Sequence, residues 1–259
     1  MNITKVTSQP LLRACRKFLA RNPIANVLPL GDIYSPLLQV SDIYSATSNN
    51  HVIGVSAVYH GFSTPSIVFG VAEPKIKQAL LKKAINEIPN DFISLCQPHE
   101  TNLFKEHATI RDSHFEQQMI AYPPKHIRCN NINATKISKN EFELLNKFYV
   151  EHHAKAWAPI QFRAGPYYCV KYNGKIVSVA GVHLATPQIV QLGNILTDEA
   201  YRNRGFATAC TNELAANLAA KGKIISLFVG IDNVPAIRIY KKLGFSKARN
   251  IAFLVMKRN

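Results

Sequence analysis

The chain has 259 residues, of which 47% are hydrophobic, and it carries 31 Lys and Arg against 16 Asp and Glu. Enough apolar residues are present to bury a core, which excludes a wholesale disordered protein. No apolar run approaches the ~20 residues of a membrane-spanning helix, and the first ten residues lack the basic and then apolar layout of a secretory signal, so no membrane segment is expected.

The first half of the chain reads as alternating strands and helices. Apolar residues recur there with the period of strands in some segments and of helices in others. The expected elements are, in order, a strand at 2–6, a helix at 8–22, a broken helix at 24–38, strands at 41–47, 51–61 and 66–73, a helix at 74–88, a strand at 91–97, a helix at 101–107 and a strand at 114–122.

A polar segment without apolar periodicity separates the two halves. Tyr122-Pro123-Pro124-Lys125 leads into Arg128-Cys129-Asn130-Asn131. The two prolines stiffen the chain, and the asparagines favour turns. We therefore expect two domains, residues 1–125 and residues 126–259.

The second half has clearer signals. Asn173-Gly174 predicts a tight hairpin, Gly222 ends a helix, and Asn233 begins another as its N-cap. The expected elements are a strand at 133–138, a helix at 139–153, an irregular stretch at 157–165, strands at 166–172, 175–184 and 188–197, a helix from 206 to about 221, a strand at 223–229, a helix at 234–243 and a final strand pair over 246–257.

The two halves share one order of elements. The helix after Pro74 corresponds to the one after Gly205, and the strand at 91–97 corresponds to the one at 223–229. A repeated unit of this length indicates two copies of one fold. We expect an α/β (α+β) protein with two tandem domains, each a mixed, mostly antiparallel twisted sheet flanked by helices.

Cysteine usage and charge indicate the cellular location and the kind of ligand. The five cysteines are odd in number and form no CxxC pair, which favours reduced thiols, a cytoplasmic location and no metal site. Residues 1–130 hold 13 Lys and Arg against 9 Asp and Glu, and residues 131–259 hold 18 against 7. The excess in the second half indicates a polyanionic ligand or surface there, and a solvated basic face is the open alternative.

One turn in the second half has the chemistry of an anion site. Arg202-Asn203-Arg204-Gly205-Phe206-Ala207 lies between an expected strand and an expected helix. Backbone N–H groups at a helix N-terminus, backed by the helix dipole, bind anions such as pyrophosphate. Gly205 permits close backbone approach, and Arg202 and Arg204 add positive charge. The segment is neither a P-loop nor a Rossmann fingerprint.

This turn resembles the R/Q-x-x-G-x-G/A motif of the GCN5-related N-acetyltransferases (GNAT). A second segment supports the resemblance, because Asn233, Ala236, Tyr240 and Leu243-Gly244-Phe245 match the family's later N-x-x-A-x-x-x-Y-x-x-L-G-F pattern. The stretch from Gly193 to Ala209 is also similar to the FR47-like branch. The resemblance covers about the last 125 residues. The first half reads Phe69-Gly70-Val71-Ala72-Glu73 at the same place, with no arginine-glycine turn, and is identified as a degenerate copy.

The resemblance implies acetyl-CoA as co-substrate, no metal, and transfer of the acetyl group to a primary amine of a small molecule or protein. It also implies a monomer or a homodimer. The family's coenzyme contacts carry over to the backbone of Ile195, Leu196 and Thr197, to Arg202, Asn203, Arg204, Gly205, Phe206, Ala207 and Thr208 of the turn, and to Asn233 and Tyr240.

Acyl transfer needs a proton donor for the departing sulfur and a proton acceptor for the amine. Tyr240 matches the family's tyrosine proton donor. Several family members place a glutamate where this chain has Gln191, which cannot take up a proton at neutral pH. If the preceding turn centres on Pro187, His183 lies across from Gln191 and could relay the proton while Gln191 orients water or substrate. A hydrogen-bonded sheet histidine, or a water chain without a single base, stays open.

The acceptor side of the family's site corresponds to the irregular stretch after the first helix of the second half. Trp157, Phe162 and Arg163 are the candidates there, with Arg163 suited to a substrate carboxylate. His152 and His153 lack further ligands at metal-binding spacing, so an exposed helix end is expected.

Three other functions remain open at this stage. The missing glutamate is compatible with a regulatory protein that binds acetyl-CoA without turnover. The FR47-like segment also occurs in enzymes that use a longer acyl-CoA. A nucleic-acid-binding module fits the basic excess, but no helix carries a run of Lys and Arg on one face and no reader motif is present, so nucleic acid is an unlikely partner.

Overall fold

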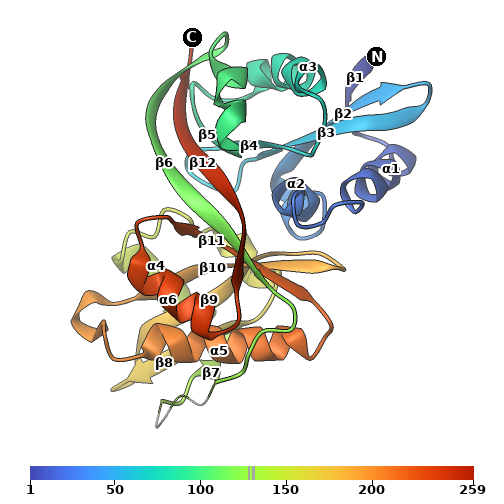
Figure 1. Ribbon diagram of the computed structural model, residues 1–259. Helices are drawn as coiled ribbons and strands as arrows, with labels where there is room; N and C mark the ends of the chain where they lie inside the picture. The colour runs from blue at the N-terminus through green and yellow to red at the C-terminus, as the bar shows by residue number, and fades with distance from the viewer. Residues whose placement is uncertain (128, 130–131) are drawn as a thin grey trace. The chain divides into compact units, whose positions relative to one another are not determined.

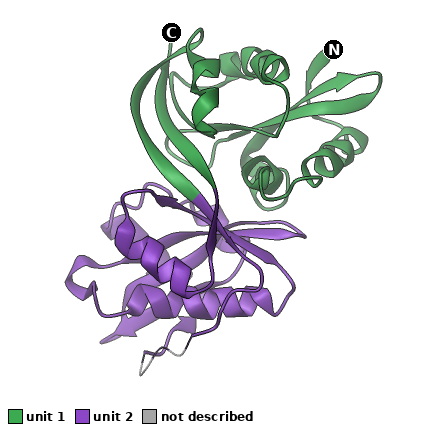
Figure 2. Ribbon diagram, viewed as in Figure 1, with its two compact units in different colours: residues 1–117, 249–259 green, residues 118–248 purple. Residues whose placement is uncertain are grey.

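The computed structural model describes residues 1–127, 129 and 132–259 (Figure 1). The chain divides into two compact units, with residues 1–117 and 249–259 in unit 1 and residues 118–248 in unit 2 (Figure 2). Each unit contains a mostly antiparallel sheet with helices packed on it, which confirms the expected fold class. Arg128, Asn130 and Asn131 of the expected boundary segment lie outside the described residues.

Unit 1 is built on a sheet in the order β1-β2-β3-β4-β5-β12-β6. The pairs β1–β2, β2–β3, β3–β4 and β5–β12 are antiparallel, and the pair β4–β5 is parallel. Its strands are β1 (Asn2–Lys5), β2 (Ser41–Ser48), β3 (His51–Tyr59), β4 (Ser66–Phe69), β5 (Asp91–Cys96), β6 (Ala108–Ala121) and β12 (Ser246–Arg258), and its helices are α1 (Gln9–Leu19), α2 (Val27–Asp32) and α3 (Pro74–Ala84), with the 3₁₀ helices η1 (Leu37–Val40), η2 (Ile85–Glu87) and η3 (Pro98–Phe104).

The helices of unit 1 form where the sequence has caps and apolar spacing. Ser8 accepts a hydrogen bond from the N–H of Leu11 at the start of α1, and α1 buries Leu12, Cys15 and Leu19 on one face. The segment expected as a broken helix forms α2 and η1 with a break between them. The helix expected at 101–107 is wrong, because that part of the chain forms the short 3₁₀ helix η3, which begins at Pro98.

The last strand returns to unit 1. Residues Ala252 to Lys257 pair antiparallel with β5, and Leu254 and Met256 join the core that α3 covers. The boundary expected after residue 125 assigned this segment to the second domain. The expected domains and the two compact units therefore differ in where they place the C-terminal strand. The strand pair expected over 246–257 is wrong as well, since Ser246–Arg258 is one strand of 13 residues.

Unit 2 carries the sheet order β6-β11-β10-β9-β8-β7, in which β6 contributes the residues from Gln118 onward. The pair β10–β11 is parallel, and the pairs among β10, β9, β8 and β7 are antiparallel. Its remaining elements are β7 (Thr135–Lys136), η4 (Lys139–Glu141), α4 (Phe142–Glu151), η5 (Pro159–Arg163), β8 (Tyr167–Tyr172), β9 (Lys175–Ala185), β10 (Ile189–Thr197), η6 (Glu199–Tyr201), α5 (Phe206–Ala219), β11 (Ile224–Gly230) and α6 (Val234–Lys242).

Helices cover both faces of the unit 2 sheet. On one face α5 and α6 pack on Val182, Val190 and Leu192. On the other face α4 and η5 pack on Tyr167 and Val179. We call the second one the acceptor face, because it carries the residues that were expected to contact the acceptor.

Local signals in the sequence explain the connections of unit 2. Asn173 and Gly174 both have positive φ, as the tight hairpin between β8 and β9 requires. Asn233 accepts a hydrogen bond from the N–H of Ala236 and so begins α6 as expected. Among the described residues, no helix is long and apolar enough to cross a membrane.

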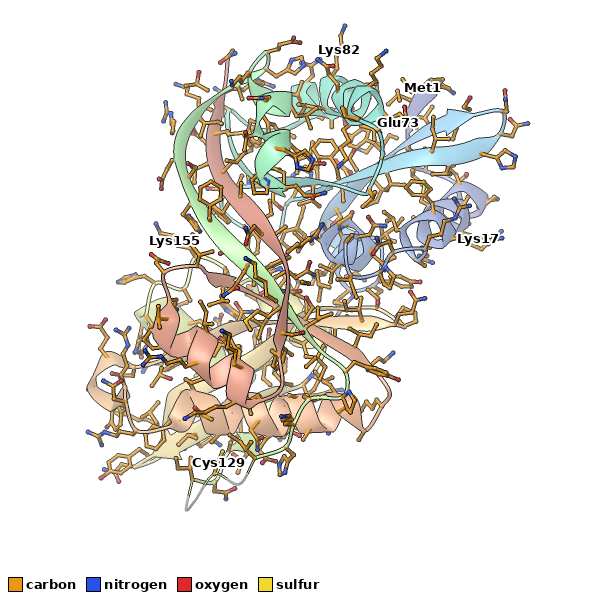
Figure 3. All side chains as sticks on the ribbon, viewed as in Figure 1. Met1, Lys17, Glu73, Lys82, Cys129 and Lys155 are labelled. Atoms are coloured by element: carbon orange, nitrogen blue, oxygen red, sulfur yellow. The ribbon has the colours of Figure 1, made fainter. Side chains whose placement is uncertain are left out.

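The segment between the two halves packs on unit 2. The N–H of Lys125 donates to the carbonyl of Leu243, and Asn212 of α5 bonds both the N–H and the carbonyl of Ile127. Cys129, labelled in Figure 3, packs against the same core. The proline-rich segment is therefore anchored along α5 and α6 at its described residues.

The role of the C-terminal strand can be tested by truncating one buried side chain. Leu254 is 1% exposed, so Leu254→Ala should lower the free energy of unfolding by about 2–5 kcal/mol, because it leaves a cavity in the core. Denaturant unfolding measures the loss, and Lys257→Ala, an exposed position on the same strand, serves as the control. Equal stabilities of the two variants would contradict the packing of β12 in this core.

Candidate coenzyme and acceptor site

The candidate site starts where two parallel strands of unit 2 separate. β10 pairs with β11 from Ile189 to Leu192, and the pairing ends there. Directly afterwards Asn194 has a φ of 54°, and the register with β9 shifts between Gly193 and Leu196. A bulge of this kind bends the strand that carries it. β10 therefore turns away from β11 at Gly193 and Asn194.

Residues beyond this bulge fit the expected contacts with the coenzyme's pantetheine arm. Leu196 and Thr197 pair with Val179 and Ser178 of β9, so their bonds to a neighbouring strand lie on one side only. The edge of Ile195, Leu196 and Thr197 that would face β11 is left without a strand partner in the described register. An extended ligand can hydrogen-bond to such an edge as a further strand would.

The phosphate turn has the geometry of an anion site. Asn203 and Gly205 have φ values of 62° and 81°, and α5 begins at Phe206. The N–H groups of Phe206, Ala207 and Thr208, the first three residues of α5, have no acceptor inside the helix. In the described part of the chain, no side chain caps this end. A group of uncapped N–H donors beside left-handed residues is a nest for an anion.

Both arginines of the turn contact residues 199–201, directly before the turn. Arg202 lies 3.0 Å from Glu199, and Arg204 donates to the carbonyl of Ala200 at 3.2 Å while its guanidinium lies 5.2 Å from the ring centre of Tyr201. Both side chains are exposed, so their charges add to the positive end of α5. The donor set fits a pyrophosphate group.

Gly205 is required by the turn for two reasons. Its φ of 81° is unfavourable for a side chain, and a Cβ there would lie 3.1 Å from Ile132. Asn233 has a different role from its neighbours, because its side-chain oxygen already accepts the N–H of Ala236 at 3.2 Å. It therefore positions α6 by capping it.

Tyr240 of α6 is a suitable proton donor. The residue is 7% exposed, and burial raises the pKa of its hydroxyl to about 12. The hydroxyl is therefore protonated at neutral pH. Its ring packs at 6.0 Å from that of Phe245.

The expected pairing of His183 with Gln191 is wrong by one residue. Gln191 pairs with Leu184, and a register shift follows before Leu192 pairs with Val182. The physical reason is the turn, which has two residues between Thr186 and Ile189: the N–H of Thr186 donates to the carbonyl of Ile189 at 3.0 Å, and the Thr186 hydroxyl accepts from the N–H of Ile189. The turn is thus centred after Pro187 and not on it.

His183 still reaches β10, because it lies at the register shift. A Cβ placed on Gly193 would be 2.8 Å from the Cβ of His183, so the imidazole lies against the backbone of β10. Gln191 lies on the same face, since its neighbours Val190 and Leu192 point into the opposite core. His183 and Gln191 are therefore both on the acceptor face.

Two further amides complete a hydrogen-bonded cluster on this face. Gln161 Nε2 donates to His183 Nδ1 at 3.0 Å, and Gln161 Oε1 accepts from Asn194 Nδ2 at 2.9 Å and from the N–H of Ala158 at 3.1 Å. Asn194 Nδ2 also donates to the hydroxyl of Tyr167 at 3.2 Å. We call Gln161, His183, Gln191 and Asn194 the amide cluster.

The cluster defines the chemical state of His183. Gln161 Oε1 accepts from two donors, so the Nε2 of Gln161 faces the imidazole. The Nδ1 of His183 must therefore accept the hydrogen bond from this Nε2. The ring is enclosed by protein atoms although part of its surface is accessible, and this burial lowers its pKa to about 4. His183 is therefore neutral at physiological pH and a weaker base than free imidazole.

The predicted acceptor residues have different environments. Trp157 stacks on Tyr149 with ring centres 4.5 Å apart and donates its indole N–H to Asn146 at 2.9 Å. Phe162 packs between Phe142 and Tyr167. Both rings are partly buried in the α4 core, whereas Arg163 is exposed. A role in acceptor binding stays a prediction for all three residues.

Sequence reasoning missed Asn194 and Tyr149, and it included Gln161 in the acceptor stretch without a role of its own. The Tyr149 hydroxyl donates to the carbonyl of Asn194 at 2.6 Å and so supports the bulge from α4. Gly193-Asn194 inside an expected strand is a sequence signal for a bulge, and it predicts the bend at Asn194. Gln161 lies in the irregular stretch, where the sequence carries no periodicity to interpret.

The two adjacent histidines end α4. His152 Nδ1 lies 2.8 Å from the carbonyl of Phe148, and its Nε2 lies 3.5 Å from Asp198. His153 is exposed and has a positive φ. Among the described residues, no group of three or more His, Cys, Asp or Glu side chains could hold a metal ion.

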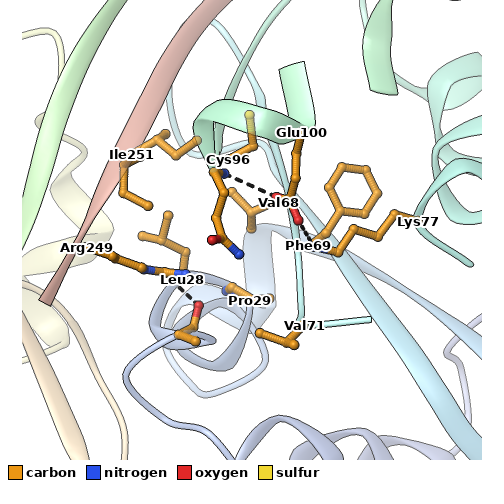
Figure 4. A pocket seen from close by; sticks show the side chains of 13 residues that line it. Leu28, Pro29, Val68, Phe69, Val71, Lys77, Cys96, Glu100, Arg249 and Ile251 are labelled. Atoms are coloured by element: carbon orange, nitrogen blue, oxygen red, sulfur yellow. Dashed lines mark hydrogen bonds and ion pairs between the residues drawn. The ribbon is translucent and has the colours of Figure 1, made fainter. Parts of the chain in front are cut away.

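Unit 1 also has a place where two parallel strands separate, and side chains of unit 1 line it. β4 and β5 pair only at Ser66–Ile93 and Ile67–Ser94, and a pocket opens beyond them (Figure 4). A buried ion pair between Lys77 and Glu100 lies in this pocket. Arg249 of β12 also lines it and donates to the carbonyl of Ala25 at 2.7 Å.

The start of α3 in unit 1 also has no side-chain cap, but no left-handed residue precedes it as Gly205 precedes α5. The N–H of Val71 donates to Asn26 Oδ1 at 2.8 Å, so a side chain of the same unit already takes this donor. A Cβ on Gly70 would lie 2.6 Å from Leu19, which shows how closely this loop packs on α1. The loop is thus tied into the core of unit 1.

Comparison with known proteins finds similarities in the part of the chain that carries this geometry. Residues 172–254 match the model described as FR47-like protein. An uncharacterised N-acetyltransferase of Methanocaldococcus jannaschii is 28% identical, in a match that covers 44% of this chain and 59% of that protein. The chain thus spans less than two thirds of the length of this relative.

Solved structures show the same fold over nearly the whole chain. A GNAT-family acetyltransferase from Novosphingobium aromaticivorans has a TM-score of 0.62 at 18% identity and covers 86% of this chain and 93% of its own. A tandem GNAT protein from the clavulanic acid biosynthesis pathway has a TM-score of 0.64 at 11% identity, with 99% and 98% covered. The chain is thus similar to GCN5-related N-acetyltransferases in residues 172–254 and shares their fold.

The phosphate turn can be tested with two glycines at opposite ends of α5. Gly205 and Gly222 both have positive φ, and nothing lies within 4 Å of a Cβ on Gly222. Alanine at either position should cost roughly 1 kcal/mol of stability through backbone strain. Only Gly205→Ala should also weaken acetyl-CoA binding, by tenfold or more in calorimetry, because it distorts the N–H donors. Equal affinities of the two variants would rule out the turn as the anion site.

His183 should make stability depend on pH in acid. Its pKa in the folded protein is about 4, below the ordinary value of 6.5, so between these values the unfolded chain binds a proton that the folded chain does not. Stability is therefore lost as the pH falls from 6.5 towards 4. His183→Gln should lose less stability over this window in denaturant unfolding, whereas His153→Gln, at an exposed position, should behave like the wild type. A wild-type pH dependence in His183→Gln would contradict the burial of a neutral imidazole.

Proposed function

We propose that the protein is an N-acetyltransferase that transfers the acetyl group of acetyl-CoA directly to a primary amine. The observation that carries this proposal is the uncapped N-terminus of α5 behind the left-handed Gly205, directly after a strand that bends away from its parallel neighbour. The uncapped N-terminus of α5 offers N–H donors to a pyrophosphate. The bend in β10 leaves a strand edge to which the pantetheine arm can hydrogen-bond. Both lie in unit 2, the unit that contains most of the FR47-like match.

The residues proposed to hold the coenzyme fall into two groups. The backbone of Ile195 to Thr197 would bind the pantetheine arm, and the turn from Arg202 to Thr208 would bind the pyrophosphate. When bound, acetyl-CoA supplies a thioester whose carbonyl carbon is open to attack by an amine. Asn233 contributes indirectly by capping α6, on which Tyr240 lies.

Two protons must move in this reaction. The amine nitrogen forms a bond to the carbonyl carbon and loses a proton, the carbon–sulfur bond breaks, and the sulfur takes up a proton. Tyr240 would donate to the sulfur, because its hydroxyl is protonated at neutral pH, although its raised pKa makes it a weaker acid than an exposed tyrosine. The hydroxyl would regain its proton from solvent after each turnover.

His183 is the candidate to receive the proton of the amine. It lies against β10 and has an uncharged ring, as a proton acceptor needs. Its low pKa and the hydrogen bond from Gln161 make it a weak base, so His183 would pass the proton on to water. Gln191, a carboxamide, would orient the amine or a water molecule.

Unit 1 is proposed to be a degenerate copy that does not bind the coenzyme. Its counterpart of the turn is bound to Asn26, and the space beside its separated strands holds the Lys77–Glu100 pair. One chain would then have one active site. The five cysteines are free thiols, which supports the proposed cytoplasmic location.

A second function is favoured by one observation. Gln191 cannot act as a base, and the neighbouring imidazole is a weak one, as in a protein that senses acetyl-CoA without turnover. A thiol-release screen over a panel of amines separates the two functions. Release of free coenzyme A with any amine supports the enzyme, and tight acetyl-CoA binding without release over the whole panel supports the sensor.

Tyr240→Phe tests the proton donor. The substitution removes only the hydroxyl, so turnover should fall at least tenfold while the affinity for acetyl-CoA stays within twofold of the wild type. Steady-state thiol release and calorimetry measure the two effects, and Tyr172→Phe, at a half-exposed position in the β8–β9 hairpin, is the matched control. An unchanged turnover number would exclude Tyr240 as the donor.

A further inference from the structure

The amide cluster contains two oxygen atoms without a hydrogen-bond donor. Gln191 Oε1 and Asn194 Oδ1 are both buried, and no described residue donates to either of them. Gln191 as a whole is only 3% exposed. Leaving a buried acceptor unsatisfied is unfavourable, so a native structure keeps such atoms for a reason.

The orientation of Asn194 is certain from its partners. Its Nδ2 donates to Gln161 Oε1 at 2.9 Å and to the hydroxyl of Tyr167 at 3.2 Å. The Tyr167 hydroxyl in turn donates to the carbonyl of Val182 at 2.9 Å, so it can only accept from Asn194. Asn194 Oδ1 is therefore a true unsatisfied acceptor and not the result of a flipped amide.

The two oxygens lie on one face, on either side of His183. Gln191 and Asn194 are three residues apart on β10, and the imidazole of His183 lies against Gly193 between them. The separation of β10 from β11 begins at this point. The acceptors thus border the place where the proposed coenzyme slot opens.

Within the described residues of unit 2, the titratable groups beside the cluster are uncharged. The titratable groups that face it are Tyr149 of α4, Tyr167 and Cys169 of β8, and His183 of β9. Both hydroxyls donate hydrogen bonds, burial raises the pKa of the Cys169 thiol, and His183 is neutral. The charged side chains of α4 and η5 are exposed, namely Glu143, Lys147, Glu151 and Arg163.

We infer that Gln191 and Asn194 form the binding subsite for the acceptor's amino group, and that this subsite selects a weakly basic amine, such as an α-amino group or an amino sugar. The inference rests on the proposed function. A neutral amine offers N–H donors to the two oxygens. An ammonium ion would have no carboxylate partner among the groups named above, and burying it unpaired is unfavourable.

The basicity of the amine determines how much of it can react. An α-amino group with a pKa near ~7.8 is roughly one-seventh neutral at pH 7, whereas a lysine ε-amine with a pKa near ~10.4 is neutral in only about one molecule in 2,500. Without a strong base in the cluster, the site cannot offset this difference. At pH 7 the neutral form of an α-amine is therefore a few hundredfold more abundant than that of a lysine, and the higher nucleophilicity of the neutral lysine amine offsets part of this difference.

Two peptides of equal length provide the test. One has a free α-amino group and no lysine, and the other has a blocked N-terminus and one lysine. In thiol release with acetyl-CoA at pH 7, kcat/KM should be at least tenfold higher for the first peptide. A preference for the lysine peptide would overturn the inference.

Gln191→Glu tests the neutral subsite directly. A carboxylate there can pair with the ammonium ion and take its proton, so the preference should shrink at least tenfold. Gln188→Glu makes the same change at an exposed position at the start of the strand and should leave the preference unchanged. Asn194 is not substituted, because its Nδ2 supports the bulge. An unchanged preference in Gln191→Glu would overturn the inference.

A second readout does not depend on turnover. In the acetyl-CoA complex, the free α-amine peptide should shift the side-chain amide NMR signals of Gln191 and Asn194, and the blocked lysine peptide should not. If neither peptide is acetylated and neither shifts these signals, the inference fails. Binding of acetyl-CoA in calorimetry judges the proposed function separately, because it depends on the phosphate turn and not on the amide cluster.

Discussion

The departure of β10 from β11 is the constraint on which the rest of the candidate site depends. Two parallel strands would normally stay paired, but the left-handed Asn194 and the shift in register after Gly193 bend β10 away. Tyr149 on α4 and Gln161 on η5 bond this bulge from the acceptor face. The same residues that open a strand edge for the coenzyme thus also place His183 and two amide oxygens beside it.

The two units differ at the place where their parallel strands separate before a helix. Neither helix start has a side-chain cap, but only α5 follows a left-handed glycine. In unit 1 Asn26 takes the N–H of Val71 in the loop before α3, and Lys77 pairs with Glu100 beside the strands. Polar side chains of unit 1 thus hold the loop and line the space beside the strands.

Most of the fold and the conformation of the Arg202–Ala207 turn could be predicted from the sequence, because the signals are local. Asn173-Gly174, Asn233 and this turn act through their own backbone conformation or the next few residues. The acceptor face depends on contacts between distant residues, such as Gln161 with His183 and Tyr149 with Asn194, which periodicity does not contain. The return of β12 to unit 1 has the same origin, since tertiary packing selects a strand partner. The one-residue error at Gln191 has a local cause, because the bonds of Thr186 centre the turn after Pro187.

Hydrogen–deuterium exchange with and without acetyl-CoA tests the central claim most directly, because it reports on both units in one experiment. The account predicts slower exchange at residues 203–208 and 193–197 when the ligand is bound, and no change at residues 70–76 at the start of α3. Protection at residues 70–76 in place of 203–208, or none at either turn, would contradict it.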